Sequence, residues 1–258
     1  MATYNPSAET FKNENGYVID GLWYPRVTSI VSIKAKPALY KFYADSPSYK
    51  ASEMALRKSA EEGTQVHEAV QAIMLGKDPV VPELIVPAVD AFRKFLASTP
   101  IETVPEYVER RIWHTDHRYA GTIDVLCTLD SKFGVLDIKT SQSIYRDYNL
   151  QTAAYMAALR DAYENLETRW ILRIDQLQTC LRCGAKRRTK GGNIKIRIDY
   201  RNGTLQRNCP EHDWSAMQGY VELQEFPFWQ DDFEAFLGAK RLWEWEFRDL
   251  LKKTGYLV

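Results

Sequence analysis

The hydrophobic pattern of the chain changes period near residue 100, and this change limits the possible fold classes. Before it, segments 51–74 and 82–98 carry residues typical of helices, with apolar positions at helical spacing in the second. After it come three successive strand-like segments, and then a further helix and a further strand. We expect the strands at 103–113, 119–129, 134–140 and 170–174, and the helix at 149–165. The order helix, three strands, helix, strand predicts a mixed α/β protein.

The flanking segments complete the predicted organisation. Asp20-Gly21 marks a tight hairpin within 17–24, residues 37–44 favour a helix, and 231–252 favours a closing amphipathic helix. We expect one compact domain that contains an insertion. Its parts are an N-terminal hairpin and helix extension (1–50), a core (51–175), an insertion rich in Cys, His and basic residues (176–226) and a C-terminal helix packed on the core (227–258).

Charge and hydropathy narrow the class of partner. The chain has 258 residues and a net charge of zero, with no apolar stretch long enough to cross a membrane and a polar start without a secretory signal. We therefore expect a cytoplasmic protein without a membrane partner. The segment from Arg182 to Arg207 nevertheless holds nine basic residues against one acid, Asp199. Such a local patch fits either phosphate contact or a solvated charged loop.

Two carboxylates and one ammonium are expected on one face of the predicted hairpin at 119–140. Alternation along strands sends Asp137 and Lys139 to the same side. A four-residue loop at 130–133 would set Asp124 opposite Lys139 and diagonal to Asp137. Neighbouring carboxylates suit a hard divalent cation such as Mg²⁺, which can polarise a phosphoryl oxygen. The competing interpretation is a surface ladder of salt bridges.

Four short motifs that surround this hairpin resemble those of a nuclease family. Gly121-Thr122-Ile123-Asp124 is similar to a G-x-x-D element, and Asp137-Ile138-Lys139-Thr140 to a D/E-x-K-T element. Upstream, 63–67 (GTQVH) resembles a G-T-x-x-H helix, and downstream, 151–155 (QTAAY) resembles a Q-x-x-x-Y helix. Gly63 has no side chain, so we expect it to let its helix approach the sheet closely. Together they resemble the RecB-type branch of the PD-(D/E)XK nuclease superfamily. Segments 27–30 and 37–39 also look like the lead-in of its phage-type and mitochondrial-genome-maintenance-type exonucleases.

The resemblance implies a fold and a set of roles. The fold would be a restriction-endonuclease-like αβββαβ core, with a mixed central sheet flanked by helices, plus a β-rich insertion held by zinc. Lys139 would serve the attacking water, Gln151 would orient Lys139 or the substrate, and Tyr155 would reach toward a DNA strand. Glu109, on the preceding strand, is either an auxiliary carboxylate or a structural residue. The implied ligands of Mg²⁺ or Mn²⁺ are His67, Asp124, Asp137 and the backbone carbonyl of Ile138.

A second metal site is predicted in the insertion. Cys180-x₂-Cys183 and Cys209-x₂-His212 are separated by 25 residues, which is typical of a structural zinc site with two knuckles. Asn202-Gly203 predicts a hairpin turn between the pairs. Some RecB-type nucleases hold an iron–sulfur cluster instead. Cys127, however, is expected inside a strand, on its buried face with Ile123 and Val125, so we favour His212 as fourth ligand and zinc as the metal. A disulfide does not suit a reducing compartment.

These observations together favour a metal-dependent DNA nuclease, an exonuclease acting on single-stranded DNA or DNA ends. The alternatives are a structure-specific flap endonuclease, an inactive nuclease-like module that only binds DNA, and a nuclease that works with a helicase or recombination partner. The resemblance places the protein in a bacterium or a phage. Trp214 and Tyr220 can stack on bases or pack in the core. The candidates for phosphate contact are Arg182, Lys186, Arg187, Arg188, Lys190, Lys195 and Arg197.

Overall fold

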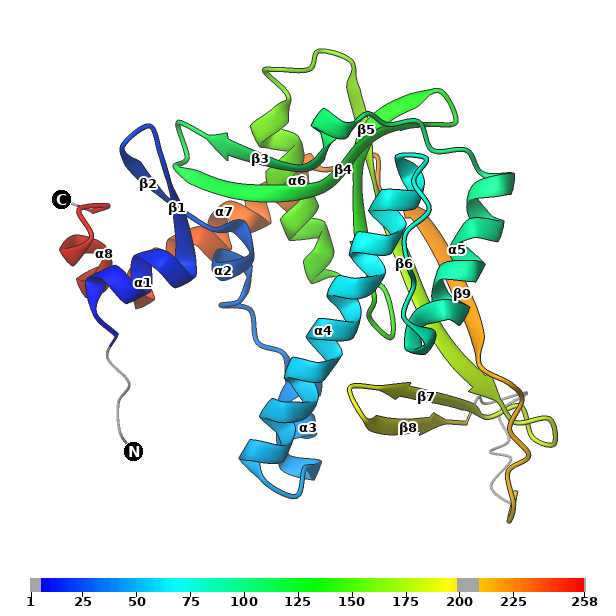
Figure 1. Ribbon diagram of the computed structural model, residues 1–258. Coiled ribbons are helices and arrows are strands. Elements are labelled where there is room, and N and C mark those ends of the chain that lie inside the picture. Colours follow the sequence, from blue (N-terminus) through cyan, green and yellow to red (C-terminus); the bar gives the residue numbers. More distant parts are fainter. Residues whose placement is uncertain (1–5, 199–208, 258) are drawn as a thin grey trace.

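The computed structural model describes residues 6–198 and 209–257, and its centre is a seven-stranded mixed sheet (Figure 1). The strand order is β3-β4-β5-β6-β7-β8, with β9 paired to β6. Strands β5 and β6 are parallel and the other neighbours are antiparallel. The bounds are β3 (Val108–His114), β4 (Tyr119–Leu129), β5 (Lys132–Lys139), β6 (Leu166–Thr179), β7 (Lys186–Lys190), β8 (Asn193–Arg197) and β9 (Gln218–Glu225). The predicted mixed α/β class is confirmed.

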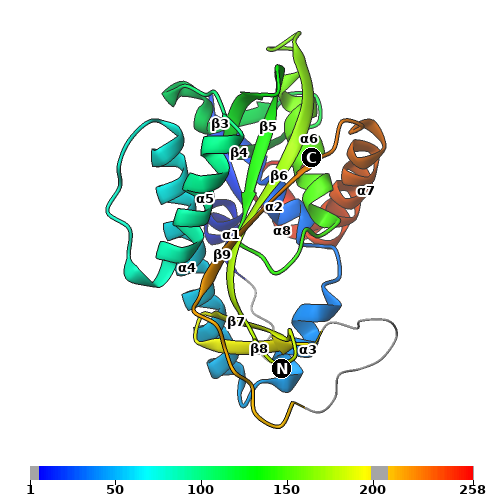
Figure 2. The ribbon, with the colours of Figure 1, turned by 90° about the vertical axis from the view of Figure 1, so that its right-hand side faces the viewer.

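Helices cover both faces of the sheet, as Figure 2 shows. On one face α4 (Tyr49–Met74) and α5 (Val86–Ser98) pack against the apolar side chains of β4, β5 and β6. On the other face lie α6 (Asp147–Leu159), α7 (Gln230–Glu246) and the short α2 (Val27–Val31). The helix α6 connects the parallel strands β5 and β6, as a crossover connection requires. Among the described residues, no helix is both long and apolar enough to cross a bilayer.

The two ends of the described chain share one core. Phe11, in α1 (Ala8–Asn15), stacks on Trp243 of α7 with ring centroids 5.9 Å apart. Trp23 lies on the hairpin formed by β1 (Gly16–Ile19) and β2 (Leu22–Pro25), and it meets the ring of Tyr256 edge-on. The N-terminal segment therefore packs into the same cluster as the C-terminal helices.

The turn between β4 and β5 is shorter than predicted. Leu129 pairs directly with Lys132, so the loop has two residues, and both Asp130 and Ser131 have positive φ. Such a turn matches the twist of a hairpin. The predicted four-residue loop is wrong, and the register shifts by two residues, which sets Asp124 in line with Asp137 rather than with Lys139. Because the shift is even, each side chain keeps its face of the sheet.

The pairing between β3 and β4 is interrupted beside the carboxylates. Val108 pairs with Val125 and Arg110 pairs with Ile123. Glu109 and Asp124, which lie between these pairs, do not pair, and Glu109 has a φ of +51°. The apolar faces change at this point, since Ile123 belongs to the cluster beneath α6 whereas Val125 and Cys127 face α4 and α5. The expectation that these three share one face is therefore wrong. The register of the two strands is the same on both sides of this point, so the irregularity adds no residue to either strand.

Several element boundaries differ from the prediction. The helix expected at 82–98 begins with a 3-10 turn, the one at 149–165 ends at 159, and the first strand begins at 108 instead of 103. The closing helix breaks at Phe247 into α7 and α8 (Arg248–Lys253). Helices α1 and α2 and strand β9 were not predicted. The expected turn at Asn202-Gly203, and the charges of Asp199, Arg201 and Arg207, lie outside the described residues.

Candidate functional site

The helix α4 presents His67 to the sheet because it approaches the sheet closely one turn earlier. A Cβ on Gly63 would lie 2.8 Å from Oγ1 of Thr140, so the absence of a side chain there permits the contact, as predicted. His67 Nδ1 lies 3.8 Å from Oδ2 of Asp124, and its side chain is 25% exposed. Burial, with the Lys139 ammonium acting in the same direction, lowers the pKa of His67 to about 4. The imidazole is therefore neutral at pH 7 and can bind a metal ion.

The two carboxylates come from adjacent strands. Oδ2 of Asp124 accepts a hydrogen bond of 2.6 Å from the backbone N–H of Ile138, the residue that follows Asp137. This bond ties the side chain of β4 to the backbone of β5. Burial raises the pKa of both carboxyl groups to about 6, against the effect of the Lys139 ammonium. A second positive charge would relieve this penalty, which is what a bound divalent cation supplies.

Lys139 and Gln151 complete a connected network with Asp137. Lys139 Nζ lies 2.5 Å from Asp137 Oδ2, and the Asp137 side chain is only 1% exposed. Nε2 of Gln151 donates to Asp137 Oδ1 at 3.0 Å, and Lys139 Nζ donates to Oε1 of Gln151 at 3.4 Å. Burial alone would lower the pKa of Lys139, but the neighbouring carboxylates reverse the effect and raise it. The amide of Gln151 thus bonds both groups, and the orienting role that the resemblance gives it stays a prediction.

Tyr155 has a different environment from the one expected. Its side chain is 2% exposed, and its ring lies beneath Gly121, where an added Cβ would come within 2.5 Å of Cε1. The hydroxyl accepts a hydrogen bond of 3.0 Å from Gln151 Nε2. It does not reach outward toward a DNA strand, because the close approach of α6 to β4 buries it. Tyr155 is a positioning residue for Gln151.

A cavity of about 580 Å³ opens beside His67 and is also lined by Glu109. Oε1 of Glu109 accepts a hydrogen bond of 2.6 Å from Nε2 of Gln71, which lies one turn after His67 on α4. Sequence reasoning did not single out Gln71, although its spacing from His67 was a usable signal. Glu109, whose φ is positive, contacts α4 through this bond, so this third carboxylate shares a cavity with the imidazole.

The donor set of this carboxylate site suits a hard divalent cation. Carboxylate oxygens and one neutral imidazole are ligands that Mg²⁺ and Mn²⁺ accept. Oδ2 of Asp137 is buried and lies against the Lys139 ammonium, so a cation bound here would share this carboxylate with Lys139. The ligand atoms of this carboxylate site are not gathered as closely as in a preformed metal site. Among the described residues, the His, Cys, Asp or Glu side chains whose ligand atoms all lie within 4.8 Å of one another are those of another group, in the insertion. Hydrogen bonds and an ion pair therefore connect the side chains of the carboxylate site, but their ligand atoms do not surround one point.

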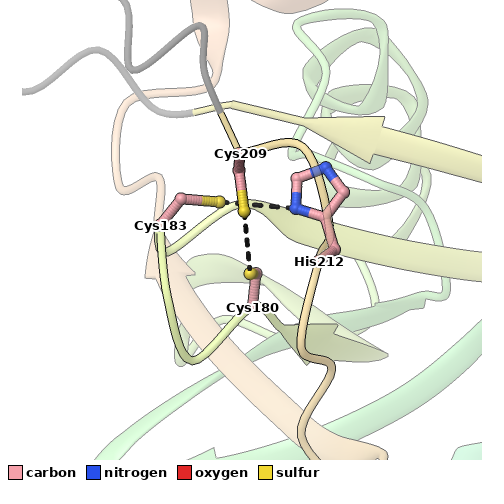
Figure 3. Close-up of side chains that lie close together, drawn as sticks. All are labelled: Cys180, Cys183, Cys209 and His212. Carbon is pink, nitrogen blue, oxygen red and sulfur yellow. Dashed lines mark hydrogen bonds between the residues drawn. The ribbon is translucent and has the colours of Figure 1, made fainter.

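That group in the insertion consists of Cys180, Cys183, Cys209 and His212 (Figure 3). Cys180 Sγ lies 3.9 Å from Cys209 Sγ, and Cys183 Sγ lies 3.4 Å from Nδ1 of His212. Zinc bonds to sulfur of about 2.3 Å in a tetrahedron place two sulfurs about 3.8 Å apart. The structure therefore brings together the four residues predicted from their spacing, in a geometry that can hold a metal ion such as zinc.

The local backbone prepares this metal site. Gly184, at φ +74°, turns the chain after the first pair so that its N–H donates to the Cys180 carbonyl at 2.8 Å. Burial acts to raise the pKa of the Cys180 thiol, but hydrogen bonds from neighbouring N–H groups and His212 bring it to about 6. A thiolate is the form that binds metal. Cys127 is fully buried among the apolar side chains below α4 and α5, as expected, and takes no part.

Several of the basic residues of the insertion hold the fold together. Arg188 pairs with Asp175 at 2.7 Å, and both Arg188 and Lys190 donate to the backbone carbonyl of Thr140, at 2.8 and 2.5 Å. The β7–β8 hairpin is thus fixed to the residue that follows Lys139. Arg187 lies over the ring of Trp214, with its guanidinium carbon 4.6 Å from the ring centroid.

The other residues that sequence analysis placed in the basic patch lie nearer the surface. Arg182 is exposed and contacts the backbone carbonyl of Glu211. Lys186 is also exposed. Tyr220, on β9, is 46% exposed and lies beneath Arg173. The exposed Lys195 and Arg197 extend along β8, the strand of the hairpin that lies farther from β6.

No protein-family model matches this sequence, and no curated protein matches it either.

Proposed function

We propose that this protein is a metal-dependent nuclease that hydrolyses phosphodiester bonds in DNA. The observation that carries the proposal is the network that joins Asp137, Lys139 and Gln151 beside Asp124 and His67. A structural salt-bridge ladder on an exposed sheet face would leave its carboxylates in solvent, whereas the Asp137 side chain is only 1% exposed. The β3-β4-β5-β6 order, with a helix between the parallel strands, is compatible with the nuclease-like core that the motifs suggested.

His67, Asp124 and Asp137 would hold Mg²⁺ or Mn²⁺, with the carbonyl of Ile138 as a further proposed ligand. When bound, such an ion polarises a phosphoryl oxygen and lowers the pKa of water. Lys139 is placed by Asp137 and Gln151 to stabilise the negative charge that develops on the phosphate or to orient the attacking water. Glu109, held by Gln71, is a further candidate ligand at the mouth of the cavity.

The zinc site would have a structural role. It closes the base of the β7–β8 hairpin, since Cys180 follows β6 directly and its backbone N–H bonds the carbonyl of Ala185 just before β7. Zinc with four protein ligands has no open position for chemistry. The metal would therefore order the insertion while the carboxylate site performs the hydrolysis.

The experiment is digestion of end-labelled single-stranded, double-stranded and circular DNA by the wild type and by Asp137→Asn, with Mg²⁺ or Mn²⁺. We expect the wild type to cleave labelled linear DNA and Asp137→Asn to lose at least about a hundredfold in rate. Glu61→Gln, an exposed acid on the same helix as His67, should keep the wild-type rate.

The products separate the competing functions. Release of mononucleotides from linear DNA alone would support an exonuclease, and cleavage of flaps or circles a structure-specific endonuclease. DNA binding without hydrolysis in the presence of either metal would contradict the proposal and support an inactive binding module. If activity appeared only after a helicase was added, the enzyme would be one component of a larger machine.

A further inference from the structure

A basic and aromatic groove lies next to the proposed catalytic cavity. It is formed by α3 (Pro37–Asp45), the N-terminal half of α4, strand β8 and the loop that leads from β5 to α6. Two adjoining cavities of about 530 and 640 Å³ make up this groove, and both views place the β7–β8 hairpin beside α3 and α4 (Figures 1 and 2). The residues that line both are Ala38, Phe42, Tyr145, Asn193 and Lys195. We call this feature the strand groove.

Cations and aromatic rings alternate along the strand groove. Lys195 Nζ lies 5.5 Å from the ring centroid of Phe42, so a side chain of β8 meets one of α3 across it. Tyr145 is 39% exposed and packs edge-on against Tyr148 at 5.7 Å. The exposed Lys36, Lys41 and Arg197 also line it, against the acids Asp45 and Asp147. Positive charge that follows a backbone, with rings on which bases can stack, is the chemistry of single-strand binding.

The strand groove leads to the carboxylates. Ser59 lines both the groove and the cavity that contains His67 and Glu109. On the other side, Tyr148 lines the groove while the Lys139 ammonium lies 5.0 Å from its ring centroid. A chain lying in the groove would therefore reach the proposed site of hydrolysis without leaving the surface that these residues form.

The tip of the β7–β8 hairpin packs against α4 beside the strand groove. Gly191 packs so tightly on α4 that an added Cβ would lie 2.3 Å from the carbonyl of Ala55, and its N–H donates to Oε1 of Glu62 at 2.9 Å. The hairpin is fixed at its other end by the Cys/His group and at the middle of β7 by the bond from Arg188 to Thr140. It therefore spans from the end of β6 to α4.

We propose that the strand groove binds a single strand of DNA and delivers it to the carboxylate site beneath the docked hairpin. The proposal rests on the proposed nuclease function for the fate of the strand, but not for its binding. It specifies an unpaired strand because the faces of Phe42 and Tyr145 can stack only on bases that are not already covered in a duplex. It assigns recognition to α3 and β8 rather than to the zinc site itself.

The test measures binding without hydrolysis, using a fluorescein-labelled oligothymidylate and zinc-loaded protein in buffer free of Mg²⁺ and Mn²⁺. We expect Lys195→Glu and Phe42→Ala each to weaken binding about tenfold. Tyr40→Ala removes an exposed ring from the same helix that does not line the groove, and Lys253→Glu makes the same charge change on α8. Both controls should bind as the wild type does.

A pair of glycine variants tests the docked hairpin. Gly191→Ala and Gly192→Ala both place a side chain at positive φ, but only at Gly191 does the new Cβ meet α4. We expect Gly191→Ala to weaken oligothymidylate binding and to increase deuterium uptake in β7 and β8 relative to Gly192→Ala. Equal binding by the two variants would overturn the role of the hairpin.

The remaining outcomes separate this proposal from its rivals. Wild-type affinity in both Lys195→Glu and Phe42→Ala, or duplex bound as tightly as the single strand, would overturn it. Loss of affinity for heparin in Lys195→Glu, with no effect of Phe42→Ala on oligothymidylate, would show a polyanion site instead. Tighter binding of oligouridylate than of oligothymidylate would contradict the assignment to DNA. If the groove variants bound the oligothymidylate more weakly but the wild type cleaved no DNA, the strand groove would be supported and the proposed nuclease function would be refuted.

Discussion

The ammonium group of Lys139 pairs with the buried carboxylate of Asp137 and bonds the amide of Gln151, and the charge of Asp124 also acts on it. The substitution Lys139→Met removes the positive charge and keeps an unbranched side chain of similar volume. We expect Lys139→Met to lower the rate of DNA cleavage by about a hundredfold or more, because stabilisation of the developing charge is lost. Single-turnover cleavage of labelled DNA in Mn²⁺ measures this.

Lys132 provides the control, since it lies on the same strand but at the exposed end, paired with Glu225 at 2.8 Å. Lys132→Met should cleave as the wild type does. An unchanged rate in Lys139→Met would remove Lys139 from the mechanism.

The raised pKa of Asp124 predicts how its contribution to the free energy of unfolding changes with pH. Its raised pKa of about 6, against 3.8 in an unfolded chain, means that the folded state binds more protons between these values. The contribution of Asp124 to the free energy of unfolding of the metal-free protein should therefore fall as pH rises from 4 to 6, and the difference between the wild type and Asp124→Asn isolates this contribution from those of Asp137 and His67. Asp124→Asn keeps an acceptor for the N–H of Ile138 and removes the charge, so it should stabilise the protein by about 1–2 kcal/mol at neutral pH.

Urea denaturation in buffer free of Mg²⁺ and Mn²⁺ measures this effect. At a pH below the unfolded-state pKa the wild type and Asp124→Asn should differ little, since the carboxyl is protonated in both states. Saturating Mn²⁺ should stabilise the wild type more than the variant. A variant that is less stable than the wild type at neutral pH would contradict this account of the site.

Local spacing was enough to predict most individual side chains of the two sites. The two pairs in the insertion and the glycine one turn before His67 follow from short-range geometry, and the structure places them as expected. The burial of Tyr155 and the bond between Gln71 and Glu109 depend on how α6 and α4 pack on the sheet. Packing of that kind is set by residues far apart in the chain, which local patterns do not report.

At the scale of elements, strongly periodic segments were predictable and irregular ones were not. Strand β4 has the predicted bounds, and α4 begins only two residues earlier than expected. The two-residue turn was missed because Lys132 and Phe133 join β5, whose pairing with β4 and β6 overrides their local character. The interrupted pairing at Glu109 and Asp124 was also missed, because the sequence gives no signal for the positive φ of Glu109.

The insertion is an element whose order should depend on its metal. We expect zinc-loaded wild type to contain one zinc per chain and Cys183→Ser to lose it, since three ligands hold zinc more weakly than four. Deuterium uptake should then rise in β7 and β8, with little change in the buried strand β4. Elemental analysis and hydrogen exchange measure the two effects.

The buried Cys127, which is not among the four ligands, supplies the matched control. Cys127→Ser should retain zinc, even though it changes the core. Iron in place of zinc, or zinc retained in Cys183→Ser, would contradict the assignment of this metal and its ligands.

At the scale of the whole molecule, one buried arginine joins the sheet to the C-terminal helices. Arg169 of β6 is fully buried, pairs with Asp232 of α7 and donates to the backbone carbonyls of Asn149, Phe226 and Phe228. Arg169→Met would leave the Asp232 charge and these carbonyls without their donor. We expect a loss of about 3–5 kcal/mol in the free energy of unfolding, measured by urea denaturation.

The exposed Arg248 on α8 is the comparison, and Arg248→Met should change stability by less than about 0.5 kcal/mol. Equal effects of the two substitutions on the free energy of unfolding would contradict the role of Arg169 in joining the sheet to α7. Sequence analysis did not single out Arg169, because an arginine inside an apolar strand shows its role only once its partners from two distant segments are known.

The central claim is that His67, Asp124 and Asp137 bind one class of divalent cation beside Lys139. Its most direct test is Mn²⁺ binding followed by electron paramagnetic resonance, with the Cys/His group already filled by zinc. We expect the wild type to bind Mn²⁺ and Asp137→Asn to bind it at least about tenfold more weakly, while Glu61→Gln binds as the wild type does. A wild type that does not bind Mn²⁺, or equal binding by Asp137→Asn, would contradict the claim.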